Sequence, residues 1–144
     1  MRILALDVGD ARIGTALTVP GTSMCMPAPA HARSGRDEAD IATILASAER
    51  EGVSRIVVGL PISLDGSLGP QARRVRRFAA DLRKAASALG IAVDTWDERF
   101  STTEAEARLR EAGRQPSRER STGSVDSAAA AIILEAYLQS RRSS

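Results

Sequence analysis

The sequence predicts an α/β fold in which a mixed sheet of about five strands has helices on both faces. Three observations support this prediction. Residues 2–8 form a run that is apolar on both alternating faces, which indicates a strand buried on both sides. A turn at Gly9-Asp10 and a second strand pattern over 13–19 then predict an opening hairpin. The later strand patterns are separated by helical ones, which implies parallel pairs.

The elements after the hairpin follow in order. A third strand around 22–30 is weakly indicated, because two prolines interrupt it. Apolar residues at spacings of three and four predict a helix over 37–51, and a β-branched run predicts a strand over 55–59. A loop rich in turn-forming residues over 60–69 precedes a helix over about 70–89.

The C-terminal third continues the alternation. A strand is expected over 91–96, and a helix begins at Ser101, where an S-x-x-E motif forms a capping box. Residues 113–123 hold no apolar anchor, so we expect a mobile loop there. A last amphipathic helix is expected over 125–140.

Composition excludes several classes of protein. The formal net charge is only +2, so affinity for a polyanion must come from where the basic residues lie. The single cysteine, Cys25, excludes an internal disulfide and a cysteine-based zinc site, and fits a reducing, cytoplasmic compartment. No apolar run approaches the roughly 18 residues of a membrane span. We expect one domain over 1–140 with a frayed tail over 141–144, and His31 in a surface loop outside the site.

Three carboxylates are expected at one edge of the sheet. Asp7 closes the first buried strand, and Glu98 follows the end of a later strand, on the side of Trp96. Asp126 shares a helix stripe with Ala130, on the face that must pack on the sheet. Two of them have a structural alternative, which is a turn hydrogen bond for Asp7 and a favourable helix N-terminal charge for Asp126.

Carboxylates that converge repel one another unless divalent cations compensate for their charge. A set of oxygen ligands without His or Cys favours Mg²⁺ or Mn²⁺ over Zn²⁺. Two such ions about 4 Å apart activate a water and stabilise the leaving oxygen in phosphodiester cleavage. The set therefore predicts a metal-dependent nuclease.

Several separated motifs, in order along nearly the whole chain, resemble the YqgF/RuvX family. They are Leu6-Asp7-Val8-Gly9 with Arg12-Ile13-Gly14, Val57-Val58-Gly59-Leu60-Pro61, Asp65-Gly66-Ser67-Leu68-Gly69-Pro70, Trp96-Asp97-Glu98-Arg99-Phe100-Ser101-Thr102, and Val125-Asp126-Ser127-Ala128-Ala129. The resemblance implies an RNase H-like fold related to the RuvC junction resolvases. It also implies a bacterial cytoplasmic enzyme described as a Holliday junction resolvase of DNA recombination and repair, or as a nuclease that matures the 5′ end of pre-16S rRNA in ribosome biogenesis.

The resemblance also implies residue roles. Asp7, Glu98 and Asp126 would be the catalytic, metal-binding carboxylates. Asp7 would bridge two ions, Glu98 would hold the ion on the leaving-group side, and Asp126 would complete the shell of the other. Ala11 and Ser127 stand where the family often has lysine, which removes two positive charges near the expected site.

Further residues are candidate contacts to a nucleic-acid backbone, with an ordinary solvated surface or loop as the alternative. These candidates are Arg12, Asp65, Gly66, Gly69, Arg73, Arg77, Arg114, Arg118 and Arg120. Only four aromatic residues are present, so a stacking platform for single strands is not supported. A four-way DNA junction or a structured pre-16S rRNA, bound through phosphates and shape, is the expected partner.

Two other classes of function stay open from the sequence. One is a non-catalytic nucleic-acid-binding factor of ribosome assembly, which would not need the three carboxylates. The other is a relative of the actin-like ATPases, which share the opening Asp-x-Gly hairpin but use two such lobes. If the protein is a nuclease, its substrate decides the oligomeric state that it needs. Junction resolution requires a homodimer, whereas trimming of an rRNA precursor does not.

Overall fold

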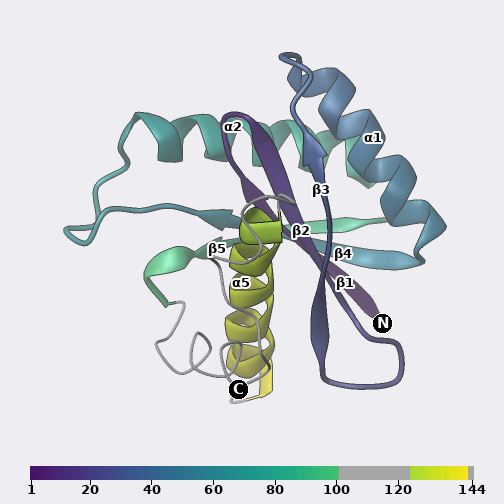
Figure 1. Ribbon diagram of the computed structural model, residues 1–144. Coiled ribbons are helices and arrows are strands. Elements are labelled where there is room, and N and C mark those ends of the chain that lie inside the picture. The colour runs from purple at the N-terminus through teal and green to yellow at the C-terminus, as the bar shows by residue number, and fades with distance from the viewer. Residues whose placement is uncertain (101–123, 143–144) are drawn as a thin grey trace.

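The computed structural model describes residues 1–100 and 124–142 and contains a mixed five-stranded sheet (Figure 1). The strands are β1 (Arg2–Val8), β2 (Arg12–Thr18), β3 (Cys25–Ala32), β4 (Val53–Leu60) and β5 (Ala92–Asp97). Their order across the sheet is β3-β2-β1-β4-β5. β1 is antiparallel to β2 and parallel to β4, and β4 is parallel to β5. The carboxyl ends of β1, β4 and β5 therefore meet at one edge.

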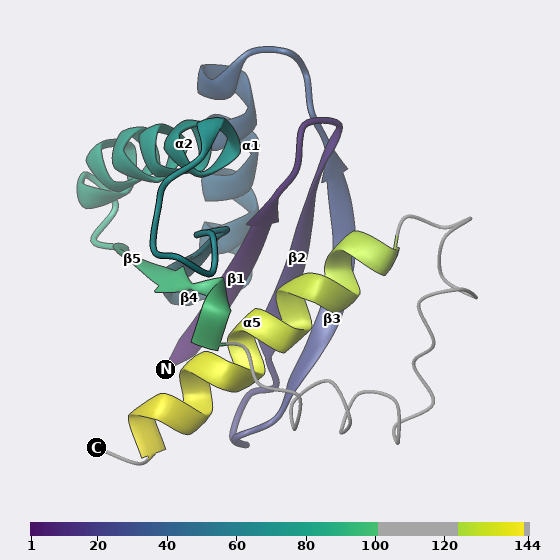
Figure 2. The same cartoon turned by 90° about the vertical axis from the view of Figure 1, so that its left-hand side faces the viewer.

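Helices cover both faces of this sheet, as predicted. Two of them, α1 (Asp37–Arg50) and α2 (Pro70–Ser87), lie on one face, and α5 (Ser124–Arg142) crosses the other (Figure 2). A short 3-10 helix, η1 (Glu98–Phe100), follows β5 directly. The predicted helix from Ser101 and the predicted loop over 113–123 lie outside the described residues.

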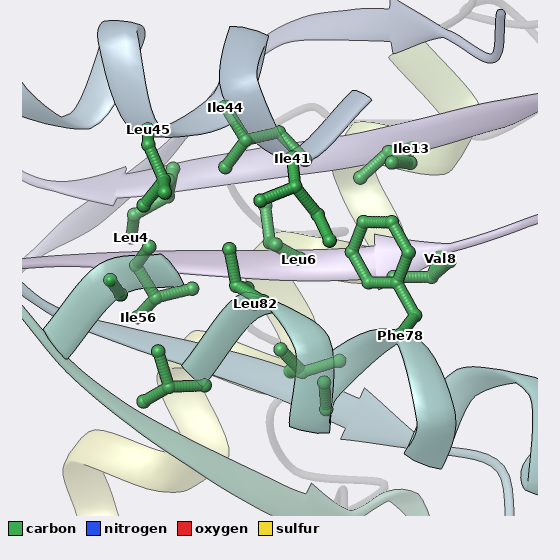
Figure 3. Packing of buried hydrophobic residues seen from close by; sticks show 14 of the residues in the cluster. Leu4, Leu6, Val8, Ile13, Ile41, Ile44, Leu45, Ile56, Phe78 and Leu82 are labelled. Carbon is green, nitrogen blue, oxygen red and sulfur yellow. The ribbon is translucent and has the colours of Figure 1, made fainter. Parts of the chain in front are cut away.

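The alternation of side chains along β1 divides the core into two halves. Leu4, Leu6 and Val8 pack against α1 and α2, together with Phe78 (Figure 3). Ala5 points the other way and packs against α5. Because side chains of a strand alternate between faces, Asp7 belongs to the α5 face of the sheet. The same alternation that buries the hydrophobic residues thus assigns this carboxylate to one face.

The weakly predicted third strand is present in the structure as β3, at the edge of the sheet. β3 holds Pro27 and Pro29, which lack the N–H that an inner strand must donate on both sides. An edge strand leaves one side unpaired, so the prolines are tolerated there. β3 also contains His31, which corrects the expectation of a surface loop.

His31 joins a buried polar cluster around Asp40, which we call the Asp40 cluster. The Asp40 carboxylate is fully buried and accepts hydrogen bonds from Arg33 Nε at 2.8 Å and from the Ser34 amide at 3.0 Å. His31 Nε2 lies 3.2 Å from the same carboxylate. Arg33 also donates from Nη1 to the carbonyl of Gly9 at 2.8 Å. The cluster therefore connects the start of α1 to the β1–β2 turn.

The last helix is longer than predicted. It runs through Arg142, whereas the sequence pattern ended it near residue 140. Arg141 donates from Nη1 to the Tyr137 hydroxyl at 2.9 Å, one turn earlier, which stabilises the final turn. None of the described helices is long and apolar enough to cross a membrane.

Candidate active site

Asp7 and Glu98 lie near each other at the carboxyl edge of the sheet. Asp7 is half-buried at the end of β1, and Glu98 is half-buried in η1, directly after β5. Burial, together with the negative charges of Asp7 and Asp97, raises the pKa of Glu98 from 4.5 to about 7. The fold therefore brings two of the three predicted carboxylates into electrostatic contact, from strands that are not neighbours in the sheet.

The end of β4, between those two strands, makes room for Glu98. A Cβ atom on Gly59 would lie 3.3 Å from the carboxyl carbon of Glu98 and would overlap Cδ1 of Ile133 on α5. Glycine at this position thus lets the carboxylate and the helix both approach the strand. The backbone of Gly59 has no left-handed conformation, so close approach is the reason for glycine here.

Gly59→Ala is expected to destabilise the fold by about 1–3 kcal/mol, because the added methyl group overpacks the contact with Ile133. The same methyl group crowds the carboxyl group of Glu98, so nuclease activity should fall as well. Urea unfolding measures the first effect and the initial rate of cleavage measures the second. Adding Ile133→Val, which removes the overlapping Cδ1 atom, should recover most of the stability. A Gly59→Ala variant as stable as the wild type would contradict this packing.

Asp97 and Arg99 hold the short helix that carries Glu98. The Asp97 Oδ1 atom accepts from the Arg99 amide at 2.9 Å, and Arg99 Nη2 donates to Oδ2 at 2.6 Å. Hydrogen bonds from Arg99 lower the pKa of Asp97, so this carboxylate stays ionised beside Glu98. Sequence reasoning did not select Arg99, although its position one residue after Glu98 and two after Asp97 was a usable signal.

The loop before α2 packs beside this helix. A Cβ on Gly66 would lie 3.5 Å from Arg99 Nη1, and Gly66 has φ +87°, which favours glycine. Asp65 accepts hydrogen bonds from the Ser67 amide at 2.9 Å and the Ser67 hydroxyl at 2.7 Å, so its carboxylate shapes the turn. Gly69 immediately precedes α2 as its N-cap residue. Contacts of Asp65, Gly66 and Gly69 with nucleic acid stay a prediction.

Ser127 fixes the first turns of α5 on the sheet. Its side chain is fully buried, and its hydroxyl donates to the Ala28 carbonyl at 2.6 Å. The hydroxyl also accepts from the Thr15 amide at 3.4 Å. Thr15 adjoins Gly14, the residue paired with Asp7 across β1 and β2. The serine at this position therefore has a structural role that sequence reasoning, which considered only the charge of a missing lysine, did not foresee.

The remaining predicted site residues lie on α5, β2 and α2 or outside the described residues. Asp126 is the third residue of α5, immediately before Ser127, and its side chain lies outside the described part of the structure. Arg12, Arg73 and Arg77 are exposed, the first at the start of β2 and the others on α2. Arg114, Arg118 and Arg120 lie outside the described residues. Within residues 1–100 and 124–142, no group of three His, Cys, Asp or Glu residues could hold a metal ion.

The raised pKa of Glu98 predicts a pH dependence of stability. The folded protein holds this proton up to about pH 7, whereas the unfolded chain releases it near pH 4.5. The folded state therefore binds more protons between these values, and the stability of the metal-free protein should fall as the pH rises through this window. Thermal unfolding from pH 4.5 to 7.5 measures the fall. Glu98→Gln should reduce it, and an unchanged slope in that variant would contradict the assignment.

Residues 1–140 match the family RuvX, described as a Holliday junction resolvase. The chain belongs to this family, which makes it a nuclease with a nucleic-acid substrate.

Curated relatives agree with that membership over the whole chain. A protein of Anaeromyxobacter sp. is 45% identical over 141 residues, which cover 98% of each chain. A protein of Pelotomaculum thermopropionicum is 42% identical over 141 residues, which cover 98% of this chain and 88% of the relative. Both relatives carry the name "Putative pre-16S rRNA nuclease".

Solved structures of low sequence identity support the fold. The RuvC protein of Thermus thermophilus, in complex with a Holliday junction substrate, aligns with a TM-score of 0.63 at 14% identity, over 99% of this chain and 96% of that one. The yeast mitochondrial Holliday junction resolvase Ydc2 aligns with a TM-score of 0.57 at 10% identity, over 95% of this chain and 77% of that one. The RNase H-like fold predicted from the motifs is thereby confirmed.

Proposed function

We propose that the protein is a divalent-metal-dependent endonuclease that hydrolyses phosphodiester bonds in structured nucleic acid. The observation that carries this proposal is the pairing of Asp7 and Glu98 at the carboxyl edge of the sheet. Burial and the repulsion between these two carboxylates both raise the pKa of Glu98. A cation between them would relieve this repulsion, so the residues fit a divalent metal.

Asp7, Glu98 and Asp126 are the proposed ligands of Mg²⁺ or Mn²⁺, and we propose two ions. Asp126 is included because the adjoining Ser127 is bonded to Thr15, beside the residue that pairs with Asp7. When bound, the metal would supply Lewis-acid activation of water and stabilisation of the leaving oxygen. The chain itself contributes the rigid strand ends that hold the carboxylates, and the contacts between Asp97 and Arg99 that orient the helix of Glu98.

The proposed substrate is pre-16S rRNA, at its 5′ leader, because the whole-chain relatives at 42% and 45% identity are named for pre-16S rRNA. A four-way DNA junction is the second candidate, favoured by the family description and by the junction-bound RuvC neighbour. The two substrates differ in what they require of the protein. Symmetric resolution of a junction needs two active sites and hence a homodimer, whereas trimming of a leader does not. In either case we propose that the protein acts in the cytoplasm.

Parallel cleavage assays test the proposal. The wild type is incubated with Mg²⁺ or Mn²⁺ and a pre-16S leader transcript, a four-way DNA junction, or a linear duplex of matched sequence. Cleavage confined to the leader supports rRNA processing, and paired nicks in the junction by a dimer support resolution. Metal-dependent cleavage must disappear in Asp7→Asn, which controls for contaminating nucleases. If neither structured substrate is cut by the wild type, the nuclease proposal is wrong and a non-catalytic binding role is favoured.

A further inference from the structure

The β1–β2 turn passes close to α2 (Figure 1). A hollow of about 190 Å³ lies between them. Val8 and Gly9 form its wall on the side of the sheet, and Gln71, Arg74 and Arg77 line it from the first half of α2. We call it the turn hollow. It is separate from the carboxylate site, because Val8 faces the helices α1 and α2 whereas Asp7 belongs to the opposite face.

The turn hollow has more basic side chains than its own acidic residues neutralise. Arg77 has no ion pair or hydrogen bond with any residue of the described ranges. Within the same ranges, Arg74 has one long ion pair, in which its Nη2 atom lies 3.8 Å from Oδ1 of Asp10. Both side chains are largely exposed. A third arginine of the lining, Arg33, is different, because it is bonded to Asp37, to buried Asp40 and to the Gly9 carbonyl. Two guanidinium groups are therefore available to an anion.

The wall of the hollow is rigid where it meets the active-site strand. The Gly9 amide donates to the Arg12 carbonyl at 2.8 Å, which closes the turn. A Cβ on Gly9 would lie 2.8 Å from that same carbonyl oxygen, so only glycine fits. Arg33 holds the Gly9 carbonyl from the other side through the Asp40 cluster. An anion bound by Arg74 and Arg77 would thus lie against a fixed turn that begins two residues after Asp7.

We propose that the turn hollow binds a backbone phosphate of the nucleic-acid substrate, next to the stretch that is cleaved at Asp7. This inference rests on the proposed nuclease function and adds a path for the substrate, from the carboxylates around the β1–β2 turn to α2. Arg74 and Arg77 donate to the phosphate oxygens, and the Gln71 amide group offers a neutral donor. Arg73, which was predicted to bind nucleic acid together with Arg77, does not line the hollow and has no part in it.

Two double variants of α2 test the proposal. Arg74→Gln with Arg77→Gln removes two charges from the hollow, and Arg76→Gln with Lys84→Gln removes two exposed charges of the same helix that do not line it. Binding of the uncleaved leader and the uncleaved junction is measured without divalent metal, at several salt concentrations. The first variant should weaken binding roughly tenfold or more and reduce the salt slope by about 1, since one neutralised phosphate contributes about 0.9. The control should change both much less, and an equal loss in the two variants would overturn the proposal.

A second measurement does not depend on nuclease activity. Inorganic phosphate is titrated into the ¹⁵N-labelled wild type, and the NMR signals of the Gly9 amide and the Arg77 Nε are followed. A shift of the Gly9 amide in the wild type that is absent from Arg74→Gln with Arg77→Gln supports the site, as does a shift of the Arg77 Nε in the wild type. No shift at either signal overturns it. If the wild type neither cleaves nor binds either structured substrate, the proposed function fails. The phosphate titration then still decides whether the hollow binds phosphate.

Discussion

Asp7→Asn is expected to reduce metal-dependent cleavage by roughly 10³-fold or more, a loss of about 4 kcal/mol of transition-state stabilisation. Asparagine keeps the size of the side chain but removes the charge that a divalent cation would neutralise. Asp7 is half-buried at the end of β1, a strand with close neighbours on both faces, so a water or a shifted side chain cannot easily replace it. Single-turnover cleavage of whichever substrate the wild type cuts measures the effect.

The same substitution should leave the fold intact and make the metal-free protein more stable near neutral pH. The charge of Asp7 is one cause of the raised pKa of Glu98, so its removal lowers that pKa and relieves the repulsion. Thermal unfolding at pH 7.5 measures this gain. Asp81→Asn, at an exposed position of α2, is the matched control and should change neither activity nor stability. Full cleavage by Asp7→Asn would exclude the proposed site.

Asp40→Leu is expected to lower the free energy of unfolding by about 3–5 kcal/mol, the typical cost of removing one partner from a buried ion pair. Leucine fills a similar volume but accepts no hydrogen bond, so Arg33 and the Ser34 amide both lose a partner. Urea unfolding measures the loss. Asp37→Asn is the matched control, since Asp37 bonds the same arginine at 2.6 Å but its side chain is 44% exposed. Its effect should stay within about 1 kcal/mol, as for other surface ion pairs.

Acid unfolding of the wild type tests the Asp40 cluster without a substitution that could prevent folding. Burial alone would raise the pKa of Asp40, but hydrogen bonds from Ser34, Arg33 and His31 lower it from 3.8 to about 2. The unfolded chain therefore takes up this proton first, and the contribution of Asp40 to stability should be lost as the pH falls from about 4 to 2. An Asp40 carboxyl that titrates near 3.8 in the folded protein, measured by NMR, would contradict the cluster.

The order and type of the described elements could be read from the sequence, because they depend on local patterns. The run of apolar residues over 2–8 requires a strand covered on both faces, and the spacing over 37–51 requires a helix with one buried stripe. The boundaries moved by only a few residues in the structure, as at the end of α5. The position of Asp7 at the end of β1 follows from the same pattern, which made this carboxylate a candidate before the family resemblance was considered.

The tertiary structure decided which residues meet. Asp40 lies on the buried side of α1 in the structure, yet no local pattern shows that Arg33 and His31 would surround its carboxylate. Ser127 bonds to β2 and β3 from about 100 residues away in sequence, at Ala28 and Thr15. Gly59 is required by Ile133 and Glu98, which come from two other elements.

The sequence by itself therefore determined the α/β class, the strand that carries Asp7 and the family to which the motifs point. It did so because hydrophobic periodicity and turn chemistry act between residues close along the chain. Only the tertiary structure decided the raised pKa of Glu98, the buried partners of Asp40 and the hollow beside Gly9. These depend on distances between side chains from separate elements, which are set by how the helices pack on the twisted sheet.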